Sequence, residues 1–149
     1  MPHAYIIRGI SGSGKSTLAK SLNIFHVESD QYFMREGEYK WNSSYLSIAH
    51  ERCFNLFRDQ LLYGADCVVS NTFTRYWEME RYINFCKQND IPYTIIRMCT
   101  EYQNTHSVPE EHIEKTKKRM EDVDGEITNH EFDLRKLIRL SLKEMGMNN

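Results

Sequence analysis

Apolar residues along this chain follow two spacings, one typical of strands and one typical of helices. Four apolar runs have the length of buried strands, at residues 4–8, 25–29, 65–70 and 93–98. Elsewhere apolar residues recur every three or four positions, as on one face of an amphipathic helix. Two such stretches are 45–63, which Gly64 ends, and 76–88. Strands and helices are therefore expected to alternate along the chain.

Two capping boxes predict where the last two helices begin. In this pattern a Ser or Thr side chain and a Glu three residues later satisfy backbone N–H groups at a helix start. Ser107-x-x-Glu110 predicts a helix to about residue 122, with Pro109 in its first turn. Thr128-x-x-Glu131 predicts a final helix over about 129–146. One face of that helix carries Leu134, Leu137, Ile138, Ser141 and Met145.

Strands that alternate with helices favour a mostly parallel sheet covered on both faces. The expected fold class is therefore a three-layer α/β sandwich with about four strands flanked by helices. The chain has 149 residues and is 40% hydrophobic, enough to bury one sizeable core. No repeat or linker interrupts it, so 1–149 is expected to be a single domain.

Charge and cysteine content exclude some function classes. The net charge of −2 provides no overall basic field that would hold nucleic acid nonspecifically. No apolar run is long enough to cross a bilayer, so no membrane partner is expected. The cysteines Cys53, Cys67, Cys86 and Cys99 stand singly, without C-x-x-C pairs. They are expected to be buried thiols in a reducing, cytoplasmic compartment.

The strongest motif is GISGSGKS at residues 9–16, directly after the first apolar run. Gly9, Gly14, Lys15 and Ser16 satisfy the phosphate-loop pattern G-x-x-x-x-G-K-[ST]. Glycine lets the backbone curl with its N–H groups inward, and the start of the following helix (17–22) adds to this anion site. The pattern therefore predicts ATP binding by Gly9, Ser11, Gly12, Ser13, Gly14, Lys15, Ser16 and Thr17. It also predicts Mg²⁺ on the Ser16 hydroxyl.

Ligands of parallel α/β sheets bind at the carboxyl ends of the strands, so the loops after the predicted strands are the expected active-site rim. Asp30 follows the second strand, where a carboxylate could accept the proton of an attacking hydroxyl or merely cap a turn. The third strand ends in Ser70-Asn71-Thr72 and lacks the aspartate that commonly holds Mg²⁺ in P-loop enzymes.

Cations crowd the end of the predicted helix at 107–122. Lys115, Lys117, Lys118 and Arg119 could close over a γ-phosphate, or could form a solvated face paired with glutamates such as Glu111. His106 lies in the loop before this helix, and Arg75 lies near the end of the third strand.

Several motifs in order resemble the small P-loop kinases related to polynucleotide 5′-hydroxyl kinase, which are often described only as AAA-type ATPases. They are GISGSGKSTLA, SDQYF, YKWNSSYLSIAHERC, SNTFTRYWEM and NTHSVPEEHIEKTKKRME. The resemblance covers about residues 4–121, so the final helix lies outside it. It implies that Asp30 is the general base and that Lys15 and Ser16 contact the phosphates and the metal.

The same resemblance implies an acceptor side and a lid. Asn71 and Thr72 match an acceptor-side pair, and Asn104, His106 and Arg119 fall in a lid at about 99–122. The chain departs from the pattern at two positions. Ser70 stands where many relatives have aspartate, and Gln103 stands where the lid usually has arginine.

The resemblance favours an ATP-dependent phosphotransferase that uses Mg²⁺. Its expected partners are ATP and a hydroxyl acceptor, a polynucleotide or nucleotide 5′-hydroxyl being favoured. Two alternatives stay open at this point. One is a nucleotide-binding switch without transfer, which the missing arginine and aspartate favour; the other is a kinase of a nucleoside or sugar.

Overall fold

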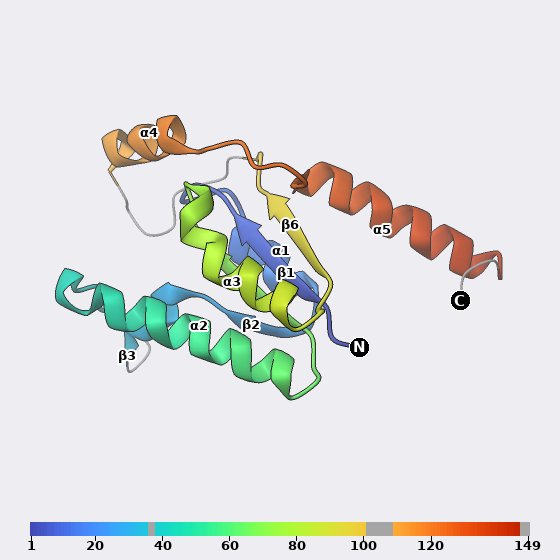
Figure 1. Ribbon diagram of the computed structural model, residues 1–149. Helices are drawn as coiled ribbons and strands as arrows, with labels where there is room; N and C mark the ends of the chain where they lie inside the picture. The colour runs from blue at the N-terminus through green and yellow to red at the C-terminus, as the bar shows by residue number, and fades with distance from the viewer. Residues whose placement is uncertain (36–37, 101–108, 147–149) are drawn as a thin grey trace.

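The computed structural model describes residues 1–35, 38–100 and 109–146, and its centre is a parallel sheet (Figure 1). The sheet has five strands in the order β2-β5-β1-β6-β7. They are β1 (Ala4–Arg8), β2 (Phe25–Val27), β5 (Cys67–Asn71), β6 (Tyr93–Arg97) and β7 (Ile127–Thr128). The expected α/β sandwich is confirmed. The fifth strand, β7, was not predicted because two residues are too few to show a strand periodicity.

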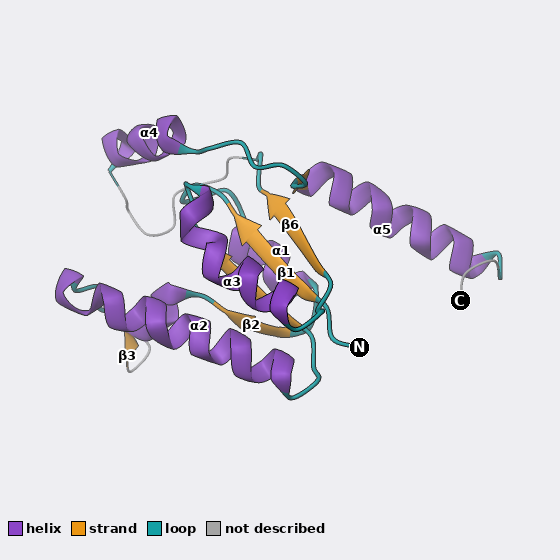
Figure 2. Ribbon diagram, viewed as in Figure 1, coloured by secondary structure: helices purple, strands orange, loops and turns teal. Residues whose placement is uncertain are grey.

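Helices flank the sheet on both faces (Figure 2). Helices α2 (Leu46–Leu62) and α3 (Tyr76–Gln88) cover one face, and α1 (Lys15–Ser21) and the first turn of α5 (Asn129–Glu144) cover the other. Helix α4 (Glu110–Arg119) contributes to neither hydrophobic cluster. Two short 3₁₀ helices, η1 (Ser29–Phe33) and η2 (Ser43–Tyr45), and a small hairpin of β3 (Met34–Arg35) and β4 (Glu38–Tyr39) fill the connection from β2 to α2.

Several predicted boundaries need correction. The second strand ends at Val27 rather than at residue 29, because Glu28 caps the 3₁₀ helix η1 there. Helix α4 ends at Arg119, since Met120 adopts an extended backbone. Its N-cap is Pro109, and the Ser107 of the expected capping box lies outside the described residues. At α5, by contrast, the Thr128 hydroxyl accepts the Glu131 N–H at 3.1 Å, as predicted.

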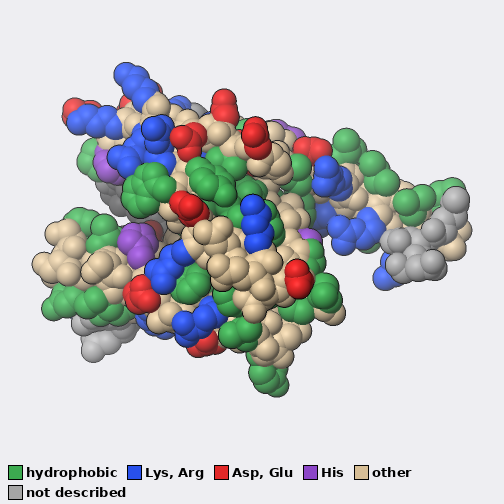
Figure 3. All heavy atoms as spheres, viewed as in Figure 1, with side chains coloured by type: hydrophobic (Ala, Val, Ile, Leu, Met, Phe, Trp, Pro, Cys, Tyr) green, Lys and Arg blue, Asp and Glu red, His purple; other side chains and the backbone are tan. Residues whose placement is uncertain are grey.

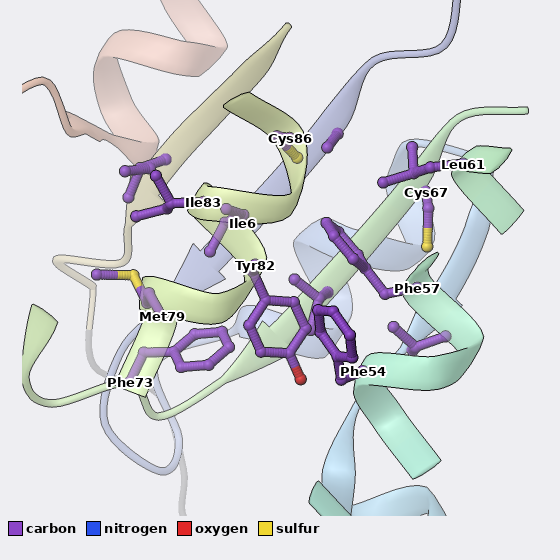
Figure 4. Packing of buried hydrophobic residues seen from close by; sticks show 14 of the residues in the cluster. Ile6, Phe54, Phe57, Leu61, Cys67, Phe73, Met79, Tyr82, Ile83 and Cys86 are labelled. Atoms are coloured by element: carbon purple, nitrogen blue, oxygen red, sulfur yellow. The ribbon is translucent and has the colours of Figure 1, made fainter. Parts of the chain in front are cut away.

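Two hydrophobic clusters lie on opposite faces of the sheet. On one face α2 and α3 pack against the sheet, and their aromatic rings meet edge to face (Figure 4). The centroid of the Tyr82 ring lies 5.3 Å from that of Phe54 and 5.0 Å from that of Phe57. On the other face, α1 and the first turn of α5 cover β1 and β6, with Ala19 and Phe132 in the cluster. Burial on both faces explains why the strands appear as continuous apolar runs rather than alternating ones.

Helix α5 extends away from the body of the molecule (Figure 1). Its first turn is anchored by the buried Asn129 and Phe132. The apolar residues of its later turns are exposed, as the green side chains on this arm show (Figure 3): Leu134, Leu137, Ile138, Leu140, Leu142 and Met145. None of the described helices is long and apolar enough to cross a membrane.

Cys53, Cys67 and Cys86 are buried as expected, but Cys99 is exposed, because it follows the end of β6 where the chain leaves the sheet. Burial raises the pKa of the Cys86 thiol to about 12.

Candidate active site

The loop between β1 and α1 has the backbone that its glycines predict. Gly12 and Gly14 adopt φ values of 80° and 89°, a left-handed conformation that side-chain-bearing residues rarely adopt. At Gly9 a Cβ atom would lie 2.6 Å from Ser13 Oγ and 2.9 Å from Met98 Cβ, so only glycine fits without displacement. Gly14 is the N-cap of α1 and gives it no side-chain cap. The first N–H groups of that helix lack intrahelical partners and can therefore bind an anion.

Two side chains of the loop are poised for a phosphate ligand. The Lys15 ammonium donates to the Ile10 carbonyl of the same loop at 2.8 Å. Burial lowers the pKa of Lys15 to about 8, while the carboxylates of Glu28 and Asp30 oppose that shift. Ser13 Oγ is buried and has no hydrogen-bond partner among the described residues. Because buried hydroxyls are normally paired, this one fits an oxygen ligand in the loop.

Glu28, which was not predicted as a site residue, occupies the space between the loop and β5. Its Oε2 atom accepts hydrogen bonds from Ser16 Oγ at 2.9 Å and from Ser70 Oγ at 3.1 Å. His26 Nε2 lies 2.6 Å from Ser70 Oγ and 3.5 Å from Glu28 Oε2. Burial lowers the pKa of His26, and the Glu28 carboxylate partly offsets this. The only sequence signal was a second acidic residue two positions before Asp30.

Asp30 lies within η1, exposed, and the residue before it is firmly held. The Ser29 N–H donates to Asn71 Oδ1 at 2.9 Å, and Ser29 Oγ lies 2.7 Å from His50 Nδ1. Asn71 Nδ2 in turn contacts Cys53 Sγ at 3.6 Å. Asn71 therefore joins η1 to β5 and α2, which places the backbone that carries Asp30. The acceptor-side role expected of Asn71 stays a prediction.

Arg75 and Arg119 come together at the start of α3. Arg119 Nε donates to Thr74 Oγ1 at 3.1 Å, and its guanidinium lies 3.9 Å from Glu78. Arg75 Nη1 donates to the Arg119 carbonyl at 3.3 Å. These contacts join the end of α4 to the loop after β5. The expected lid residues Asn104 and His106, and Gln103 with them, lie outside the described residues.

Lys and Arg side chains gather over α4 (Figure 3). Lys115 lies 3.7 Å from Glu111, and Lys117 lies 3.6 Å from Glu114. These pairs fit the solvated-face interpretation for the lysines of this helix.

Arg8 is a buried residue beside the candidate site that sequence reasoning missed, because it was taken only as the end of a strand. It is fully buried, and its Nε donates to the Phe73 carbonyl at 2.9 Å. Its Nη2 donates to the Thr74 carbonyl at 3.0 Å, and its Nη1 lies 2.7 Å from Glu126 Oε1. Next to it, the Gly9 N–H donates to the Thr72 carbonyl at 3.2 Å. The start of the phosphate loop is thus tied to the loop after β5.

A pocket of about 430 Å³ opens beside the phosphate loop. Its apolar walls come from Ile10 of the loop, Met98 after β6 and Met120 after α4. Its other lining residues are Arg97, Cys99, Thr100, Lys117, Glu126 and Thr128. The volume and the mixed lining suit a group of nucleoside size.

A family model described as an AAA domain matches residues 5–133. The chain belongs to the AAA domain family. An uncharacterized protein of Pasteurella multocida is 30% identical over 121 residues, which are 69% of this chain and 68% of that one. Human NEDD4-binding protein 2 is 32% identical over 87 residues, 52% of this chain. The match spans only 5% of the length of that human protein.

Solved structures similar to this AAA domain include kinases. A gluconokinase from Sinorhizobium meliloti has a TM-score of 0.56 at 16% identity, over 85% of this chain and 80% of that one. A sugar kinase from Janibacter sp. has a TM-score of 0.56 at 14% identity, over 86% of this chain and 84% of that one. The Pnkp1/Rnl/Hen1 complex contains a chain with a TM-score of 0.55 at 17% identity, over 76% of this chain and 38% of that one. At these identities the likeness establishes the fold alone, which this chain shares with these proteins.

Proposed function

We propose that this AAA domain is an ATP-dependent phosphotransferase that moves the γ-phosphoryl group of ATP to a hydroxyl. The observation that carries the proposal is the joint placement of a phosphate loop and an acidic 3₁₀ helix. The carboxylates of Glu28 and Asp30 both raise the pKa of Lys15, so both lie within electrostatic reach of the loop cation. A carboxylate in that position could accept the proton of a hydroxyl that attacks a phosphate held by the loop.

Each part of ATP·Mg²⁺ has a matching part of the site. The triphosphate fits the N–H groups of the loop, the Lys15 ammonium and the unpartnered Ser13 hydroxyl. The nucleoside fits the 430 Å³ pocket beside Ile10. Mg²⁺, when bound, would neutralise charge on the phosphates, and the Ser16 hydroxyl would be its protein ligand.

Transfer needs a base and a cation besides the loop. Asp30 takes the proton from the acceptor hydroxyl as that oxygen bonds to the γ-phosphorus and the bond to ADP breaks. Arg119 is the proposed cation for the charge that spreads over the transferred group, because a guanidinium can contact two phosphate oxygens at once. Its present contacts at Thr74 and Glu78 hold it at the start of α3.

The proposed acceptor is a polynucleotide or nucleotide 5′-hydroxyl. Aromatic rings surround the segment that carries Asp30: Tyr32 lies 5.6 Å from Phe33 and 6.4 Å from Tyr45, and Phe33 lies 6.4 Å from Trp41. Trp41 is 55% exposed and Tyr45 is 42% exposed. Exposed rings next to the proposed general base favour an acceptor that carries a nucleobase, since nucleobases stack on aromatic side chains.

The sugar-kinase and gluconokinase likenesses favour a small-molecule acceptor as the second candidate. A screen that measures transfer of labelled γ-phosphate distinguishes the two, with 5′-hydroxyl DNA, 5′-hydroxyl RNA, nucleosides and sugars as acceptors. Label on a 5′-hydroxyl end supports the proposal, and label on a sugar alone replaces its acceptor. Label on none of these, with ATP still bound, would favour the nucleotide switch. Because the net charge is −2, binding of the acceptor should depend weakly on salt; a steep slope would mean six or so phosphate contacts.

Asp30→Asn is the direct test of the base. The amide keeps the shape of the side chain but is a poor proton acceptor, so kcat should fall by about 10²–10⁴-fold while the affinity for ATP changes little. Steady-state transfer and calorimetric ATP binding measure the two effects. Unchanged turnover on the true acceptor would mean that Asp30 is not the base.

A further inference from the structure

The Ser16 hydroxyl has a carboxylate partner, although the third strand of the chain, β5, ends without an aspartate. In P-loop enzymes the loop Ser or Thr and an aspartate after a neighbouring strand hold Mg²⁺ between them. Here Ser70 stands at that strand end, and its hydroxyl carries no charge to attract a cation. Within residues 1–35, 38–100 and 109–146, no three His, Cys, Asp or Glu side chains are placed so that together they could hold a metal ion. A cation at Ser16 would therefore depend on very few protein ligands.

The carboxylate of Glu28 lies between Ser16 and Ser70, although it comes from the end of a different strand. It follows β2, which pairs in parallel with β5, so the carboxyl ends of the two strands lie side by side. Its Oε2 atom is 2.9 Å from Ser16 Oγ and 3.1 Å from Ser70 Oγ, so one carboxylate oxygen joins the loop hydroxyl to the strand end. The side chain is 24% exposed, so most of its surface is shielded from solvent.

The direction of these hydrogen bonds matters for a metal ligand. Ser16 donates its only hydroxyl hydrogen to Glu28, so its lone pairs are directed away from the carboxylate. A lone pair is what a hydroxyl offers to Mg²⁺, which prefers oxygen ligands and commonly retains several waters. Partners that orient a metal ligand in this way strongly affect the affinity of a site.

We propose that Glu28 is the carboxylate of the magnesium site, where it supplies the negative charge that Ser70 lacks and orients the Ser16 hydroxyl toward the cation. The inference rests on the proposed function, because it concerns the metal that accompanies ATP. It also separates the two acidic residues of this segment by role. Glu28, half-buried beside Ser16, serves the metal, and the exposed Asp30 serves the acceptor.

The experiment is calorimetric titration of ATP into wild type, Glu28→Gln and Glu28→Asp, each without divalent cation and with Mg²⁺. For wild type, Mg²⁺ should raise the affinity for ATP. In Glu28→Gln that gain should fall by about tenfold or more, as expected for loss of a metal-orienting partner. Metal-free ATP affinity should be kept or should rise, because a negative charge near the phosphates is removed. Glu28→Asp keeps the charge and should retain part of the gain. Thermal unfolding checks that each variant is folded.

Two further variants distinguish a metal role from a merely structural one. Glu28→Gln combined with Ser70→Asp returns a carboxylate to the end of β5, and it should recover the Mg²⁺-dependent gain. Asp30→Asn should retain the gain. With Mn²⁺ as the probe, electron paramagnetic resonance should show tight binding of Mn²⁺·ATP to wild type and to the double variant, and weakened binding to Glu28→Gln.

The outcomes separate the inference from the proposed function. If wild type binds ATP neither with nor without Mg²⁺, the proposed function fails. If wild type shows the Mg²⁺ gain and Glu28→Gln retains it, Glu28 is not the metal carboxylate. Loss of metal-free binding in Glu28→Gln, or loss of the gain in Asp30→Asn alone, would also overturn the assignment.

Discussion

Lys15 carries its charge in a mostly enclosed position, where the free protein satisfies it with a carbonyl of its own loop. The hydrogen bond to Ile10 at 2.8 Å keeps the ammonium over the loop, and burial lowers its pKa to about 8. A bound triphosphate would place several negative charges around the same group and raise its pKa. The affinity for ATP is therefore coupled to the protonation of this one residue.

The pH dependence of ATP binding tests this coupling. Below pH 8 Lys15 is already protonated in the free protein, so this group should leave the affinity unchanged with pH. Above that pH, binding must take up a proton, and the affinity should fall by up to about tenfold per pH unit until the pKa of the complex is reached. Calorimetry at fixed Mg²⁺, in buffers of different ionisation enthalpy, measures both the affinity and the proton uptake.

Lys15→Arg is the matched control, because a guanidinium stays charged throughout this range and its binding curve should be flat. Lys15→Met should bind ATP about tenfold more weakly or worse, through loss of a charged hydrogen-bond donor. Proton uptake by wild type that is zero between pH 8 and 9.5 would contradict the assignment.

At the scale of elements, three segments that are distant in the chain meet around one pocket. Ile10 comes from the loop before α1, Met98 follows β6 and Met120 follows α4. Their apolar side chains offer a surface for the planar base of a nucleotide, and the loop is directly adjacent. The end of α4 therefore belongs to the proposed nucleotide site, whatever role its lysines have.

Met120→Glu tests the pocket as the nucleoside site. A carboxylate at this wall should lower the affinity for ATP by about tenfold or more, since a base that packs against it would have to displace its water. The affinity for inorganic triphosphate, which has no base, should change little. Leu137→Glu makes the same charge change on the exposed part of α5 and should leave both affinities unaltered. Equal weakening of both ligands by Met120→Glu would place the nucleoside elsewhere.

At the scale of the whole molecule, the guanidinium of Arg8 connects the sheet to two segments beside the site, the loop after β5 and the segment after α4. It lies at the end of β1, the central strand, and donates to the carbonyls of Phe73 and Thr74. The same group contacts the Glu121 carbonyl and the Glu126 carboxylate, each at 2.7 Å. The loop after β5 and the segment between α4 and β7 are thus held by one fully buried cation.

Arg8→Met should lower the free energy of unfolding by about 3–5 kcal/mol, because it leaves Glu126 and several carbonyls without their partner. Urea unfolding, followed by circular dichroism, measures the loss. Arg8→Lys should recover little, since an ammonium cannot make the forked set of contacts. Arg135→Met removes an exposed pair with Glu131 and should change stability hardly at all, which provides the control. If Arg8→Met lowers the free energy of unfolding no more than Arg135→Met does, the contacts of Arg8 contribute little to stability.

Much of the fold was readable in the sequence where neighbouring residues decide the structure. The glycines of the loop, the helices near 45–63 and 76–88 and the Thr128 cap all depend on contacts within a few positions of the chain. The prediction failed at short elements, such as β7 and the 3₁₀ helix η1, because two to five residues hold too little periodicity to identify them. The apolar face of α5 was predicted, but its exposure was not.

What the sequence by itself determined is therefore the phosphate loop and the alternating elements that position it, since both follow from local backbone preferences and short-range periodicity. The tertiary structure alone decided which distant side chains share a site. Glu28 meets Ser70 across 42 positions of the chain, and Arg8 meets Glu126 across 118. Such pairs depend on the order of strands in the sheet, which brings segments distant in the chain to the same edge, and no spacing along the chain encodes that order.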